Sequence, residues 1–168
     1  MYLINEAIGG QMKKVYLELT NRCNLDCIIC YRKAWHETTK DMDDKDLFHV
    51  IDQLKNNKQV EQVVLGGIGE PTFAKQINKV MKELSDKELI MTSNGSIMSD
   101  EIISHIVQHL NHLVISIDGT SDMFYKVRKF PLDKIMDNVA KIVQEKRRLH
   151  SSTPEISFQM VLTTFIAC

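Results

Sequence analysis

Short apolar runs and longer stretches with helical spacing alternate along this chain. Five short runs, each bounded by polar or glycine-rich residues, predict β-strands. Between them, apolar residues recur every three or four positions, which places them on one face of an α-helix. The predicted strands cover residues 14–20, 62–65, 89–91, 112–119 including a turn, and 155–162. The predicted helices carry the apolar sets Leu47–Leu54, Ile77–Leu84, Ile102–Leu110 and Leu132–Val143.

Polar residues mark where these helices begin. Asp43 or Asp44 precedes the first apolar set and Ser99 or Asp100 precedes the third, so each can cap a helix N-terminus. Pro131 stands where the fourth helix starts, a position that suits its fixed backbone angle. The start signals therefore agree with the apolar spacing.

Strand and helix alternate four times before a last strand, which predicts an α/β fold with a parallel sheet. We expect about five parallel strands and four covering helices. Each predicted strand ends in small, polar or glycine-rich residues, and α/β barrels place their chemistry at such strand ends. A doubly wound open sheet has the same periodicity and stays open as an alternative. The strand-end motifs favour a partial (β/α) barrel.

Residues 1–13 are predicted to be a lead-in, and residues 14–168 one core domain that is incomplete at its C-terminus. A complete eight-unit barrel takes at least about 200 residues. Here the sequence stops shortly after the fifth predicted strand. An apolar strand left at a sheet edge is prone to aggregation. We therefore expect either a truncated gene product or a partner that covers this edge.

Composition narrows the class of protein. The chain has 168 residues, 43% of them hydrophobic and 26% charged, with a net charge of −1, values ordinary for a globular domain. Near-neutral charge gives no support for a nucleic-acid or membrane surface. No secretory signal is visible, and no apolar run approaches the roughly 20 residues of a membrane-spanning helix. The expected location is the cytoplasm.

Three of the four cysteines, Cys23, Cys27 and Cys30, follow the first predicted strand within one short loop. This clustering favours metal binding over a disulfide framework. Iron–sulfur clusters are normally held by four cysteine thiolates, so a loop with three leaves one iron of a [4Fe–4S] cluster open. The alternatives are a structural zinc site, a redox-thiol module or unrelated core cysteines. Zinc prefers four closed ligands, and no further Cys or His pair has suitable spacing.

Three further strand ends carry small polar motifs. Gly67-Ile68-Gly69-Glu70-Pro71 follows the second predicted strand, and glycines there let the backbone approach a ligand closely. Ser93-Asn94-Gly95 and Ser116-Ile117-Asp118-Gly119 follow the third and fourth. Taken singly, each is also an ordinary turn sequence. Arg128 follows the fourth predicted strand and could bind a carboxylate through two hydrogen bonds. The alternative is a solvated arginine on a helix.

The spacing Cys-x3-Cys-x2-Cys, followed by these motifs in this order, resembles the radical SAM superfamily over residues 14–162. The resemblance implies a [4Fe–4S] cluster ligated by Cys23, Cys27 and Cys30, with S-adenosylmethionine chelated at the open iron. It also implies that Glu70 holds its turn. Ile29 stands where the family often has an aromatic residue against the adenine, and Ile68 where a glycine is commoner. The implied contacts to S-adenosylmethionine are Ile29, Tyr31, Gly67, Gly69, Glu70, Ser93, Asn94, Ser116, Asp118 and Arg128.

Within the superfamily, Cys-Asn-Leu-x-Cys-x-x-Cys-Tyr and Ser-Ile-Asp-Gly resemble enzymes with a SPASM or twitch extension, which mature peptides, enzymes or cofactors. The run from Cys30 to Trp35 is similar to the maturases of tungsten-cofactor aldehyde ferredoxin oxidoreductases. The implied partners are a low-potential electron donor such as ferredoxin or flavodoxin, and a protein or cofactor substrate. A non-catalytic iron–sulfur-binding fragment stays open as an alternative to an enzyme.

Overall fold

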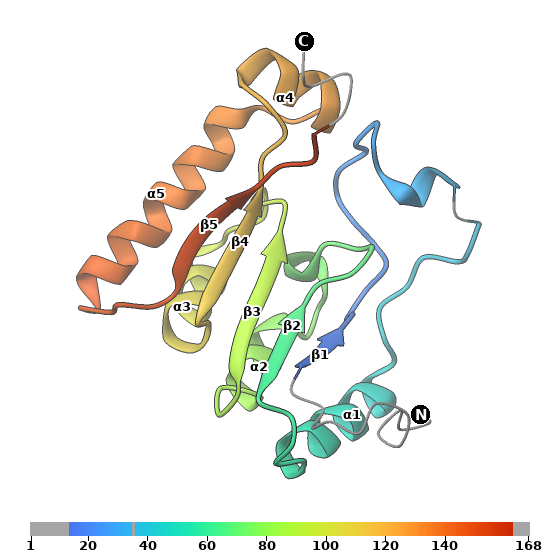
Figure 1. Cartoon of the computed structure of the whole chain (residues 1–168), viewed down its shortest axis with the longest axis vertical. Coiled ribbons are helices and arrows are strands. Elements are labelled where there is room, and N and C mark those ends of the chain that lie inside the picture. Colours follow the sequence, from blue (N-terminus) through green and yellow to red (C-terminus); the bar gives the residue numbers. More distant parts are fainter. Residues whose placement is uncertain (1–13, 35, 163–168) are drawn as a thin grey trace.

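The computed structural model describes residues 14–34 and 36–162. The predicted lead-in at residues 1–13, Trp35 and residues 163–168 lie outside the described residues. In the described residues, five strands form one parallel sheet in the order β1-β2-β3-β4-β5 (Figure 1). The strands are β1 Lys14–Leu17, β2 Gln62–Leu65, β3 Glu88–Ser93, β4 His112–Ser116 and β5 Glu155–Gln159.

Helices connect these strands. The α-helices are α1 Asp44–Asn56, α2 Ile77–Glu83, α3 Asp100–His109, α4 Ser121–Arg128 and α5 Leu132–Arg148. Two short 3-10 helices, η2 Tyr31–Ala34 and η3 Pro71–Phe73, follow the cysteine loop and β2. The four predicted helices are confirmed as α1, α2, α3 and α5. The sequence pattern did not indicate α4, which has only eight residues.

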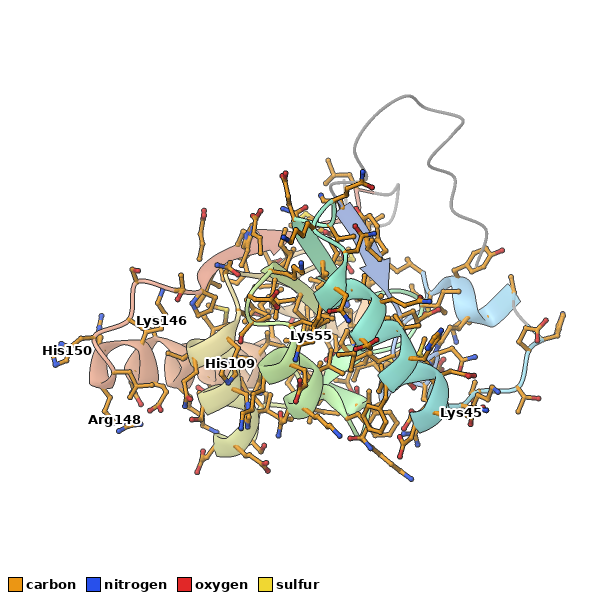
Figure 2. The ribbon with its side chains drawn as sticks, turned by 90° about the horizontal axis from the view of Figure 1, so that it is seen from below. Lys45, Lys55, His109, Lys146, Arg148 and His150 are labelled. Atoms are coloured by element: carbon orange, nitrogen blue, oxygen red, sulfur yellow. The ribbon has the colours of Figure 1, made fainter. Side chains whose placement is uncertain are left out.

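The strand order decides between the two architectures that the periodicity left open. A doubly wound sheet reverses its strand order and carries helices on both faces. Here each strand pairs with the next one in the chain, and α1, α2, α3 and α5 lie on one side of the sheet. Figure 2, seen from below, shows the helical layer beneath the strands, with Lys55 and His109 among its labelled side chains. This is the winding of a (β/α) barrel, as the strand-end motifs predicted.

The hydrophobic core lies between the sheet and this helical layer. Side chains of successive strand residues point to opposite faces. Leu65, Met91 and Leu113 are neighbours across three strands, and all three are fully buried against the helices. Thr92 and Val114 occupy the opposite face, and both are only partly buried. The described residues therefore form a sheet that helices cover on one face only.

Most helix boundaries follow from local chemistry. Ser99 caps α3 by accepting a hydrogen bond from the backbone N–H of Ile102, and Pro131 is the N-cap residue of α5. Asp43 is the N-cap residue of α1, although its side chain makes no capping bond. The predicted first and fifth strands are longer than β1 and β5. The first one ends early because Thr20 forms an isolated bridge with Asp41 instead of pairing with β2.

Among the described residues, none of the helices combines the length and apolar character needed to cross a membrane. The cytoplasmic location stays a prediction.

Candidate functional site

The cysteine loop leaves the carboxyl end of β1 and is held on both sides by main-chain hydrogen bonds. Leu19 accepts from the N–H of Met42 at 2.8 Å, which joins the start of the loop to the approach of α1. Further along, the N–H of Ile28 donates to Val127 of α4 at 2.8 Å. The loop and α4 both lie beyond the tips of the strands (Figure 1). The helix that the sequence pattern missed therefore supports the cysteine loop.

Cys23, Cys27 and Cys30 are all free thiols and are all partly exposed. The N–H of Cys30 donates to the carbonyl of Cys27 at 3.2 Å, which closes a tight turn between these two. Burial raises the pKa of the Cys23 and Cys27 thiols, and the charges of Cys23 and Cys30 raise the pKa of Cys27 further. The three sulfur atoms are thus close enough to interact electrostatically.

The donor set fits an iron–sulfur cluster. Three thiols in one loop can each bind a different iron of a cubane. Among the described residues, no group of three His, Cys, Asp or Glu side chains converges on a single metal ion. A cubane does not require such convergence, because its irons are separate.

The loop after β2 packs directly against the cysteine segment. The carboxylate of Glu18, just past β1, accepts hydrogen bonds from the backbone N–H groups of Ile68 and Gly69. Gly67 has a φ of +153°, and a side chain there would collide with Glu18. A Cβ on Gly69 would overlap the Thr20 carbonyl and lie 2.7 Å from that of Arg22. Gly69 is therefore required for a close contact between two backbones, whereas Gly67 leaves room for the Glu18 side chain.

Glu70 is the centre of a buried hydrogen-bond network. Its side chain is 3% exposed, and one carboxylate oxygen accepts from the Thr72 N–H, the Thr72 hydroxyl and the Ser93 hydroxyl. The other oxygen accepts from the N–H of Asn94 at 2.7 Å. Burial raises the pKa of Glu70, although these donors act in the opposite direction. Glu70 caps η3, so the prediction that it holds its turn is confirmed.

Asn94 extends this network to the cysteine loop. Its side-chain amide donates to the sulfur of Cys23 at 3.6 Å and to the side chain of Asn24 at 3.1 Å. Asn24 in turn donates to the hydroxyl of Ser96 at 2.8 Å. The ends of β2 and β3 and the first cysteine thus form one connected polar site.

Asp118 and Arg128 bind each other. The Arg128 Nε and one terminal nitrogen donate to the same oxygen of Asp118, at 2.7 and 2.6 Å. The other oxygen of Asp118, which is fully buried, accepts from the N–H of Val161 at 2.9 Å. The thiol of Cys27 also lies 4.0 Å from the carbonyl of Arg128. This pair therefore links the end of β4, α4 and the segment after β5.

The remaining predicted cofactor residues have different environments. Ser116 ends β4 and is partly buried, on the face that the helices leave uncovered. Ile29 is partly buried within the cysteine loop, whereas Tyr31 is 72% exposed. The structure thus brings the predicted residues to one edge of the sheet. Their contacts to S-adenosylmethionine stay predictions.

Sequence reasoning missed several residues that shape this site. Arg22, directly before Cys23, forms two 2.8 Å hydrogen bonds with Asp41 and stacks on Phe73, 4.8 Å from its ring centre. Arg32, two residues after Cys30, bonds to carbonyls inside the loop. Their positions beside cysteines were visible in the sequence, but their partners depend on the fold.

Comparisons with known proteins agree with this geometry. The family model of the Radical SAM superfamily matches residues 17–155. The chain is 24% identical over 157 residues to the "Tungsten-containing aldehyde ferredoxin oxidoreductase cofactor-modifying protein" of Pyrococcus furiosus, covering 90% of this chain and 44% of that protein. It is 22% identical over 147 residues to the "Probable GTP 3',8-cyclase" of Methanocaldococcus jannaschii, covering 83% of this chain and 48% of that protein. The chain thus spans about half the length of these curated relatives.

Solved structures show the same fold. Streptococcus suis SuiB bound to the precursor peptide SuiA superposes with a TM-score of 0.70 at 18% identity, over 90% of this chain and 33% of that one. The structure of "Native anSMEcpe with bound AdoMet and Cp18Cys peptide" superposes with a TM-score of 0.66 at 16% identity, over 88% of this chain and 42% of that one. With a family match over most of its length and this fold, the chain belongs to the radical SAM superfamily.

Proposed function

We propose that this chain binds a [4Fe–4S] cluster and S-adenosylmethionine to begin radical chemistry in the maturation of an enzyme, peptide or cofactor. The observation that carries the proposal is the loop of free Cys23, Cys27 and Cys30, joined through Asn94 to the Glu70 network. Cys23, Cys27 and Cys30 would hold three irons. When bound, the cluster and S-adenosylmethionine together supply a 5′-deoxyadenosyl radical that abstracts hydrogen from a substrate.

The chain's own residues would bind and orient S-adenosylmethionine. The segment from Gly67 to Gly69 packs against Glu18 and the cysteine segment, and its main-chain carbonyls would accept hydrogen bonds from the ammonium group of S-adenosylmethionine. The carboxylate of Glu18 at the same loop adds negative charge where an ammonium would bind. Ser116 offers a hydroxyl donor and acceptor for polar groups of the ligand, whereas the Asn94 side chain would have to exchange its bonds to Cys23, Asn24 and Ser96 to contact it.

Glu70 and Ser93 would act mainly by keeping this edge of the sheet in shape. Ser93 is 2% exposed, and its hydroxyl is already shared between Glu70 and the N–H of Gly95. Asp118 and Arg128 would have to exchange their mutual ion pair to contact a ligand.

A role in maturation rests on the relatives. The Pyrococcus furiosus protein is named as cofactor-modifying, and the SuiB and anSMEcpe structures hold peptides. The proposal includes a low-potential electron donor such as ferredoxin or flavodoxin, because reduction of the cluster needs an external electron. Within the superfamily, we propose that the chain belongs to the SPASM or twitch class and, within that class, to the maturases of tungsten-cofactor enzymes.

Anaerobic reconstitution with iron and sulfide tests the proposal. We expect about four irons and four sulfides per chain, as the cubane requires, and 5′-deoxyadenosine after addition of dithionite and S-adenosylmethionine. A bound cluster without S-adenosylmethionine cleavage would support the non-catalytic fragment instead. Bound zinc without an iron–sulfide chromophore would contradict both.

Two cysteine variants sharpen this test. Cys27→Ala should abolish the chromophore, because it removes one of the three loop ligands. Cys168→Ser removes the cysteine outside the loop and should leave the iron content unchanged. A chromophore that survives Cys27→Ala would show that the ligands are assigned wrongly.

A further inference from the structure

Arg32 joins the two ends of the cysteine loop. It lies in η2, two residues after Cys30, and its guanidinium reaches back over the loop. One terminal nitrogen donates to the carbonyl of Cys23 at 3.3 Å, and the other donates to that of Leu25 at 2.9 Å. Arg32, which follows the third cysteine, thus holds the main chain at the first cysteine and two residues after it.

The guanidinium has a further donor that these bonds do not use. The Nε of Arg32 is buried and has no hydrogen-bond partner among the described residues. Buried polar groups in folded proteins nearly always have partners, so an unpaired donor calls for an explanation. The Arg32 guanidinium therefore keeps one donor beyond those that bind the Cys23 and Leu25 carbonyls.

The guanidinium of Arg32 places a positive charge directly beside the first cysteine, because one of its nitrogens lies 3.3 Å from the Cys23 carbonyl. Asp26 and the neighbouring Lys33 form a separate ion pair at 2.6 Å, and both side chains are well exposed. The two adjacent cations therefore differ: Arg32 is tied to the loop backbone, and Lys33 is bound to a surface carboxylate.

We propose that Arg32 is a positioning residue that holds the cysteine loop in its cluster-binding shape and favours the reduced state of the cluster. This inference rests on the proposed function. The planar fork of arginine can serve two carbonyls at once, which a lysine ammonium cannot do in the same geometry. A fixed positive charge stabilises the extra electron of a reduced cluster, and charge and hydrogen bonding near the sulfurs set its potential.

Three variants test the inference after anaerobic reconstitution of the chain: Arg32→Gln, Arg32→Lys and the matched control Lys33→Gln. Iron and sulfide per chain, and the rate of iron loss to a chelator, report how the loop holds the cluster. The midpoint potential, from a redox titration followed by electron paramagnetic resonance, reports the effect of charge. Circular dichroism verifies that each variant is folded.

We expect Arg32→Gln to lose iron roughly 10- to 100-fold faster than wild type, the usual range for residues that orient metal ligands, and to have a more negative potential. Arg32→Lys should also lose iron faster, because one carbonyl bond is lost, with a smaller change in potential. Lys33→Gln should match wild type in both measurements. A folded Arg32→Gln that holds no cluster, beside a loaded Lys33→Gln, supports the inference.

The inference is overturned if Arg32→Gln and Lys33→Gln retain iron equally well and have the same potential. If Arg32→Gln fails to fold, Arg32→Lys decides: iron loss at the wild-type rate overturns the inference, and faster loss supports it. A wild-type chain that binds no iron and sulfide would instead refute the proposed function, so the two failures can be told apart.

Discussion

The helix-covered face of the sheet and the loops at its carboxyl edge are both buried, but different forces hold them. Leu65, Met91 and Leu113 fill the covered face through apolar packing alone. At the edge, Glu70 and Ser93 are equally buried, yet they are held by directed hydrogen bonds. Apolar packing depends mainly on volume, whereas a buried polar network depends on each donor and acceptor being paired.

The covered face and the carboxyl edge therefore tolerate different substitutions. A smaller side chain on the covered face leaves a cavity but no unpaired group. At the edge, one added methyl group or one lost hydroxyl disturbs the contact that positions the cysteine loop.

The largest effect is expected from Gly69→Ala. Its Cβ would overlap the Thr20 carbonyl, so the backbone of the cysteine segment must move. We expect a loss of unfolding free energy of about 4 kcal/mol or more, a size reserved for severe local disruption, measured by urea denaturation. Gly66→Ala is the control, because its Cβ would meet only the Thr92 side chain at an ordinary 3.7 Å. Equal losses in the two variants would contradict the close packing at Gly69.

On the covered face, Leu113→Ala should lower the unfolding free energy by about 2–5 kcal/mol, because it removes a fully buried side chain and leaves a cavity. Val114→Ala, on the other face of the same strand, should cost less because Val114 is only partly buried. Both would be measured by urea denaturation. If Val114→Ala costs as much as Leu113→Ala, another part of the protein covers the second face as tightly.

At the polar edge, Ser93→Ala should cost about 1–3 kcal/mol of unfolding free energy. The Gly95 N–H would lose its acceptor, and the Glu70 carboxylate would lose one of its donors. Ser85→Ala removes an exposed hydroxyl that bonds only to Lys82, and should change stability by less than about 0.5 kcal/mol. Thermal unfolding of the cluster-free proteins compares the two. A negligible effect of Ser93→Ala would mean that the network does not stabilise the fold.

The smallest effect concerns pH. Burial raises the pKa of Glu70 in the folded state, so its contribution to stability is present below the ordinary glutamate pKa and is lost as pH rises through the folded pKa. The stability of wild type relative to Glu70→Gln should therefore fall as pH rises over this window. Urea denaturation of both cluster-free proteins at several pH values measures this. A difference that stays constant or grows with pH would show that the four donors outweigh burial.

Much of the fold could be predicted because its signals are local. The apolar spacing of α1, α2, α3 and α5 and the β2 run Gln62–Leu65 were readable directly. The short helix α4 was missed because its eight residues show too little periodicity to distinguish it from the turn that precedes it. The end of β1 was placed too late, because the bridge from Thr20 to Asp41 is a contact between distant residues.

The site divides in the same way. The cysteine spacing and the strand-end motifs indicated which residues meet, since the carboxyl ends of parallel strands share one edge. The sequence did not indicate how they meet: Asp118 binds Arg128, and Glu70 binds Ser93 and Asn94. The Glu70 bonds depend on how the ends of β2 and β3 are aligned, which the periodicity of a single strand does not contain. The Asp118–Arg128 pair depends on α4, which the sequence pattern did not indicate.

Apolar periodicity and ligand spacing are properties of neighbouring residues, so the fold class and the cysteine loop could be read from the sequence. The folded structure was needed to show that the sheet winds in one direction, that Gly69 must lack a side chain, and that Arg32 spans the loop. Each of these depends on atoms that are distant in the chain or face each other across a turn. Their contacts arise only when helix packing has brought the strand ends together.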